Sequence, residues 1–62
     1  MIRIYLNIKT GFYYKYEHPS QIYISKDLHR WIPSLIRREQ LLMEIDTGVL
    51  QHLSTYEYSK FN

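Results

Sequence analysis

Two alternating runs on either side of Gly11 constrain the fold of this chain more than any other feature of its sequence. Apolar residues occupy every second position from Ile2 to Ile8, and a similar alternation resumes over 12–17. This period is that of a strand with one buried face, and a glycine between two such runs is typical of a hairpin turn. The sequence therefore predicts strands at about 2–9 and 12–17.

The register of this hairpin can be predicted by keeping charges off the buried face. A two-residue turn at Thr10 and Gly11 would place Leu6 opposite Lys15 and bury a charge. A three-residue loop at 9–11, with Gly11 in the left-handed conformation, avoids this. It makes the pairs Ile8 with Phe12, Leu6 with Tyr14, Ile4 with Tyr16, Tyr5 with Lys15 and Arg3 with Glu17. We therefore expect the even-numbered apolar residues of both strands to share the buried face.

A third strand is predicted at about 22–25, after a turn formed by His18, Pro19 and Ser20. Keeping the faces consistent places Tyr16 opposite Ile22 and Tyr14 opposite Ile24. The outer face of this three-stranded meander then carries the candidate partner-binding residues, which are Arg3, Tyr5, Tyr13, Lys15 and Tyr23.

The next segment, about 26–45, has the spacing of an amphipathic helix. Ser25 is a good N-cap, and apolar residues follow at helical intervals; they are Leu28, Trp31, Ile32, Leu35, Ile36, Leu42 and Met43. Pro33 cannot donate a hydrogen bond within a helix, so the segment either breaks there or kinks. The candidate helix face for binding a partner or a nucleic acid carries Arg30, Arg37 and Arg38.

Several alternatives stay open in the last third of the chain. Glu39 falls on the apolar stripe, where it lies at an edge, bonds to a neighbouring side chain, acts as a functional carboxylate or contacts a partner. Residues 46–48 resemble a helix stop with Gly48 as the left-handed cap. Beyond it, 49–53 continues the helical phase and 55–61 alternates like a strand, so 49–62 is open between a helical turn, a fourth strand and a docking peptide.

Length and composition limit the classes of function. A chain of 62 residues buries only about 60% of the surface that its unfolded form exposes, and without Cys it has no disulfide to compensate. Its formal net charge of +2 is far below that of a dedicated nucleic-acid binder. No apolar run approaches the roughly 20 residues that span a bilayer, and no secretory signal precedes the first strand. We therefore expect a soluble cytoplasmic protein that gains stability from a partner chain.

No residue pattern marks a catalytic or metal site. The three histidines, at positions 18, 29 and 52, are widely spaced and form no helical pair, so no metal ligands are predicted. Phosphate-binding loops need more glycines than the two present, and no motif marks a nucleophile with its base. The sequence predicts no enzymatic activity, no cofactor and no small-molecule substrate.

These observations together predict one α+β domain over 1–62, in which a three-stranded antiparallel meander packs on a C-terminal helical segment. The Tyr-rich outer face indicates a non-catalytic protein-binding module, for which a homodimer is one expected form. The absence of Ala and the abundance of Ile and Tyr suggest a short phage or mobile-element product that inhibits a host protein. The alternative is a DNA- or RNA-binding regulator that uses the same sheet face or the basic helix face.

Overall fold

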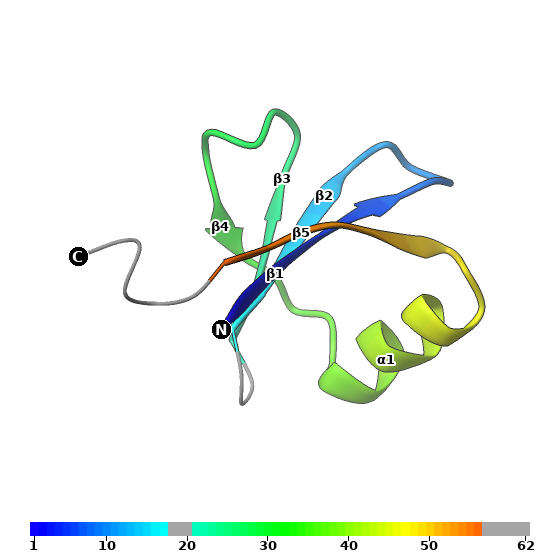
Figure 1. Cartoon of the computed structure of the whole chain (residues 1–62). Coiled ribbons are helices and arrows are strands. Elements are labelled where there is room, and N and C mark those ends of the chain that lie inside the picture. Colours follow the sequence, from blue (N-terminus) through cyan, green and yellow to red (C-terminus); the bar gives the residue numbers. More distant parts are fainter. Residues whose placement is uncertain (18–20, 57–62) are drawn as a thin grey trace.

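The computed structural model describes residues 1–17 and 21–56, which form a five-stranded antiparallel sheet and one helix (Figure 1). The elements are β1 (Ile2–Asn7), β2 (Tyr13–Glu17), β3 (Gln21–Ser25), β4 (Ile32–Pro33), α1 (Arg38–Asp46) and β5 (Leu50–Tyr56). The strand order is β4-β3-β2-β1-β5, so the last strand returns to pair with the first. The α+β class is confirmed, but the prediction of a three-stranded meander followed by a terminal helix is wrong, because two further strands form and α1 precedes β5.

The first three strands are confirmed to within about two residues at each end, but the predicted register of the first hairpin is wrong by one residue. The observed β1–β2 pairs are Ile2 with Glu17, Arg3 with Tyr16, Ile4 with Lys15, Tyr5 with Tyr14 and Leu6 with Tyr13. Asn7 explains the difference: its side-chain Oδ1 accepts hydrogen bonds from the N–H groups of Lys9 and Thr10, at 2.9 and 3.1 Å. The Asn7 carbonyl accepts from Gly11, so the loop holds one residue more than predicted.

This one-residue shift exchanges the two faces of β1 relative to β2. The predicted pairing of β2 with β3 is confirmed, with Tyr16 opposite Ile22 and Tyr14 opposite Ile24. These four residues lie on the face of the sheet that is turned towards α1, here called the helix-side face. Arg3 and Tyr5 of β1 lie on the same face, because they pair with Tyr16 and Tyr14. The other face, here called the outer face, carries Ile2, Ile4, Leu6, Tyr13, Lys15 and Tyr23. The predicted outer row of Tyr5, Lys15 and Tyr23 is therefore not formed.

The predicted helix over 26–45 is mostly wrong, because only Arg38–Asp46 is helical. Ser25 caps a turn instead: its hydroxyl oxygen accepts from the N–H groups of Asp27 and Leu28, at 3.2 and 3.1 Å. Leu28 has a φ of 69°, which no helical residue adopts. Pro33 lies in β4, a two-residue strand at the edge of the sheet among the described elements, where a missing N–H is tolerated.

The core lies between α1 and the helix-side face of the sheet. Its buried residues are Tyr5, Tyr16, Ile22, Leu41 and Leu50, with Tyr14, Ile36 and Ile45 packed against them. Leu41 has no exposed surface, whereas Leu42 and Met43, which the predicted stripe contained, are exposed. Glu39 is also exposed, in the first turn of α1, where a carboxylate interacts favourably with the helix dipole.

The end of α1 follows the sequence prediction, and the segment after it adopts one of the alternatives left open, that of a further strand. The helix ends at Asp46, and Gly48 has a φ of 85°, which confirms the left-handed glycine. Residues 50–56 form β5 rather than another helical turn. Leu53 is skipped in the β1–β5 pairing, because Tyr5 pairs with His52 and Ile4 with Ser54. The predicted turn at 18–20 and the rest of the tail, 57–62, lie outside the described residues.

Candidate binding surfaces

The outer face of the sheet brings together three of the five predicted binding residues, namely Tyr13, Lys15 and Tyr23. Lys15 of β2 lies directly opposite Tyr23 of β3, and its ammonium Nζ is 5.0 Å from the centre of the Tyr23 ring. The same Nζ is 5.0 Å from the centre of the Trp31 ring. Tyr13 lies on the same face, opposite Ser25. We call Tyr13, Lys15, Tyr23 and Trp31 the aromatic face.

The other two residues predicted for this surface lie on the helix side. Tyr5 is only 4% exposed and makes an edge-to-face contact with His52, with ring centres 5.7 Å apart. Arg3 is exposed beside Tyr16. Both placements follow from the register shift at Asn7, since a slip of one residue moves every side chain of a strand to the opposite face. Tyr5 is therefore part of the core and not of a binding surface.

Trp31 is the member of the aromatic face that the sequence reasoning missed, because it was assigned to a helix stripe. The two residues after Trp31 in the sequence indicate that this segment is extended and not helical. A residue before proline is biased towards extended conformations, and Ile32 precedes Pro33. An extended Ile32 opposite Ile24 makes Pro33 pair with Tyr23, which brings the segment containing Trp31 beside the outer face.

The predicted arginine face on a helix is not formed. Arg30 lies in the loop between β3 and β4, Arg37 is the N-cap of α1, and Arg38 is its first residue. All three are exposed, but they come from different kinds of structure and share no helix face. The predicted helix face with all three arginines therefore does not exist among the described residues.

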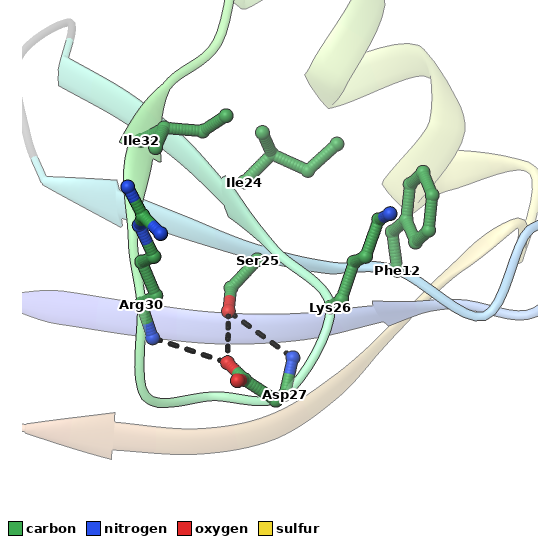
Figure 2. A pocket seen from close by; sticks show the side chains of 7 residues that line it. All are labelled: Phe12, Ile24, Ser25, Lys26, Asp27, Arg30 and Ile32. Atoms are coloured by element: carbon green, nitrogen blue, oxygen red, sulfur yellow. Dashed lines mark hydrogen bonds between the residues drawn. The ribbon is translucent and has the colours of Figure 1, made fainter.

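A pocket of about 450 Å³ lies beside the β3–β4 loop (Figure 2). Its lining residues are Phe12, Ile24, Ser25, Lys26, Asp27, Arg30 and Ile32, and we call it the hairpin pocket. Figure 2 shows Phe12 with Lys26 at one end, Ile32 with Arg30 at the other and Ile24 between them. The Lys26 Nζ is 5.9 Å from the centre of the Phe12 ring. The two cationic side chains, Lys26 and Arg30, thus lie at opposite ends of an apolar floor formed by Phe12, Ile24 and Ile32.

The loop that forms one wall of this pocket is held by two side chains. Asp27 Oδ1 accepts hydrogen bonds from the N–H groups of His29 and Arg30, at 2.9 and 3.1 Å, and from the Ser25 hydroxyl at 3.1 Å. The hydrogen bonds from Arg30, His29 and Ser25 lower the pKa of the Asp27 carboxyl to about 2. This carboxylate therefore stays ionised and fixes the loop in which Leu28 adopts its left-handed conformation.

Acidification is expected to release this loop at an unusually low pH. The folded-state pKa of Asp27 lies below its ordinary value of 3.8, so the stabilisation is complete above pH 3.8 and is lost as the pH falls towards about 2. The amide NMR signals of His29 and Arg30 should therefore titrate with a midpoint of about 2. Asp27→Asn keeps an acceptor oxygen but cannot titrate, so it should abolish this transition. A midpoint near 3.8 would show that the hydrogen bonds do not form in solution.

A second hollow, of about 320 Å³, lies between the β1–β2 loop and α1. Glu44 lines it; one of its carboxylate oxygens, Oε2, accepts from Gln40 Nε2 at 2.8 Å. The other, Oε1, is buried with no hydrogen-bond partner among the described residues. Burial and the nearby Glu44 carboxylate raise the pKa of Tyr14 above its usual 10.0. Within the described residues, this hollow therefore contains a carboxylate of which one buried oxygen is left without a hydrogen bond.

Within residues 1–17 and 21–56, no three His, Cys, Asp or Glu side chains are grouped so as to hold a metal ion. The one helix in this part of the chain is too short and too polar to cross a membrane. No protein family model matches the sequence, and searches among curated proteins and solved structures find no similar protein.

Proposed function

We propose that this chain is a non-catalytic module that binds another protein through the aromatic face. The observation that carries the proposal is the position of Lys15, whose ammonium lies 5.0 Å from the ring centres of both Tyr23 and Trp31. Aromatic residues are enriched in protein interfaces because they offer a large apolar area at little cost in conformational entropy.

The arrangement around Lys15 supports binding because it fixes the rings before a partner arrives. Each cation–π contact at a partly exposed site contributes about 0.5–1 kcal/mol, and together they restrict the rotamers of both rings. Side chains that are already ordered lose less entropy on binding, which increases affinity. Tyr13, Tyr23 and Trp31 are each half-buried, so each still presents part of its ring to solvent.

Nucleic-acid binding is the second candidate, because bases stack on exposed aromatic rings. Two observations rank it lower. The Lys15 ammonium is already placed against two rings, and the arginines at positions 30, 37 and 38 come from a loop and a helix N-terminus instead of the single helix face expected to follow a phosphate backbone. Salt separates the two candidates, since affinity for nucleic acid falls steeply with ionic strength and affinity at an aromatic protein interface does not.

The proposal is tested by affinity capture from the cells that produce the protein. Tagged wild-type chain, Tyr23→Ser and Met43→Ser are compared, with and without nuclease, and the folding of each is checked by circular dichroism. Met43 is exposed on α1, away from the aromatic face, so Met43→Ser is the control for loss of an exposed apolar side chain. We expect recovery of the partner to fall about tenfold with Tyr23→Ser and to stay unchanged with Met43→Ser.

Two results would contradict this function. Undiminished capture by Tyr23→Ser would remove the aromatic face as the binding surface. An eluate that contains only nucleic acid, or that is lost after nuclease treatment, would favour the second candidate. Light scattering over a range of concentrations tests the case in which the partner is a second copy of this chain.

A further inference from the structure

The hairpin pocket lies on the helix-side face of the sheet, where α1 leaves that face uncovered. The buried core below α1 contains Tyr5, Leu41 and Leu50, at the side of the sheet nearest β5. At the opposite side, Ile24 and Ile32 form a cross-strand pair, and Ile32 is 53% exposed. With Phe12 they make an apolar surface that the described part of the chain leaves open to solvent.

The positive charges around this surface exceed the negative charge. Among the described residues, neither Lys26 nor Arg30 forms a side-chain ion pair or hydrogen bond, apart from the contact of Lys26 with the Phe12 ring. Asp27 is the one acidic residue in the lining, and its Oδ1 already accepts three hydrogen bonds from the loop. The pocket therefore has a net charge of +1, with its two cations at opposite ends of the apolar floor (Figure 2).

We propose that the hairpin pocket binds a short acidic segment of a partner protein, in which one large apolar side chain lies between two carboxylates. The apolar side chain would pack on Phe12, Ile24 and Ile32. The carboxylates would pair with Lys26 and Arg30, which lie at the two ends of this floor. A volume of about 450 Å³ is within the range of sites that hold a ligand group.

Two features favour a peptide segment over a free small molecule. Sites for small molecules bury most of their ligand, whereas four residues of this lining, Lys26, Asp27, Arg30 and Ile32, are exposed. A side chain anchored in a larger protein needs less enclosure, because contacts outside the pocket supply the rest of the affinity. The hydrogen bonds of Ser25 and Asp27 hold the loop in place before binding, which lowers the entropy cost.

The test uses a fluorescein-labelled peptide with one leucine between two glutamates and measures binding by fluorescence anisotropy. Two matched peptides replace the glutamates with glutamines or the leucine with serine. We expect either replacement to weaken binding about tenfold. In NMR titrations with the glutamate peptide, the amides of 25–32 and of Phe12 should shift most.

Charge reversal makes the test specific to the pocket. The double variant Lys26→Glu, Arg30→Glu should lose the glutamate peptide and bind a peptide with lysines in the same two positions. The control Lys9→Glu, Arg37→Glu changes the net charge equally at exposed residues outside the pocket, and it should keep the original preference. If the double variant fails to fold, Arg30→Gln gives the same comparison with a smaller expected loss.

Three outcomes would overturn this inference: no measurable binding of the glutamate peptide, equal losses in the pocket and control variants, or tighter binding of a single-stranded oligonucleotide at the same residues. The aromatic face lies on the other side of the sheet, so Tyr23→Ser should leave the affinity for the peptide unchanged. Failure of one site is thereby distinguished from failure of the other.

Discussion

Leu41→Ala is expected to lower the free energy of unfolding by about 3 kcal/mol, because removal of a buried leucine loses its transfer free energy and leaves a cavity. Leu41 has no exposed surface and is the buried residue of α1, in the same core cluster as Tyr5 and Leu50. A chain of 62 residues has a stability of about 3–9 kcal/mol, so the expected loss is a large part of the total. Urea unfolding followed by circular dichroism measures it.

The neighbouring leucine is a matched control on the same helix. Leu42 is 45% exposed, so Leu42→Ala should cost less than about 1 kcal/mol. If Leu41→Ala is too unstable to measure, Leu41→Met keeps the volume and should cost less than about 1.5 kcal/mol. Equal costs for the two alanine variants would show that α1 packs with a different face against the sheet.

The features that sequence reasoning predicted correctly are those that depend on local chemistry. Gly48 ends α1 because the left-handed conformation is inexpensive only for glycine, and no distant contact is needed to infer it. The β2–β3 pairing was also predictable, because alternation on both strands leaves one register that keeps Tyr16 and Ile22 together.

The register of β1 was not predictable in this way, because both faces of that strand are buried. Ile2 and Ile4 are buried on one face, and Tyr5 and Asn7 are buried on the other. An alternating pattern identifies the core face only when the opposite face is exposed to water. The side-chain hydrogen bonds of Asn7 then decided the loop length, a contribution that hydrophobic matching does not contain.

Two further physical reasons explain why the helix predicted from residue 26 does not form before residue 38, and why 49–53 offered a helical turn as an alternative to the strand that is observed. Serine and aspartate side chains bond backbone N–H groups equally well in a helix cap and in a turn, so the residues 25–27 do not distinguish the two. In β5, the skipped residue Leu53 interrupts the alternation and leaves leucines at positions 50 and 53, an interval that resembles a helix. The positions of Trp31 and of the hairpin pocket both depend on β4. Sequence reasoning missed them because it assigned the residues of β4 to the helix that Ser25 was expected to cap.

Tyr5→Ala is expected to cost about 3 kcal/mol, and it separates the observed register from the one predicted from the sequence. In the observed pairing, Tyr5 lies opposite Tyr14 in the core and is 4% exposed. In the alternative pairing it would lie opposite Lys15 on the outer face, where truncation would cost about 1 kcal/mol.

Tyr13→Ala is the control, because the alternative register places Tyr5 and Tyr13 on the same outer face and so predicts similar costs for both. In the observed fold Tyr13 is half-buried on the outer face, opposite Leu6, and its truncation should cost about 1 kcal/mol. Urea unfolding of the two variants gives the comparison, and cross-strand NMR contacts between Tyr5 and Tyr14 give an independent one. Equal destabilisation, together with contacts from Tyr5 to Lys15, would mean that the isoleucines of β1 face the helix. Tyr5 would then lie on the outer face beside Lys15 and Tyr23.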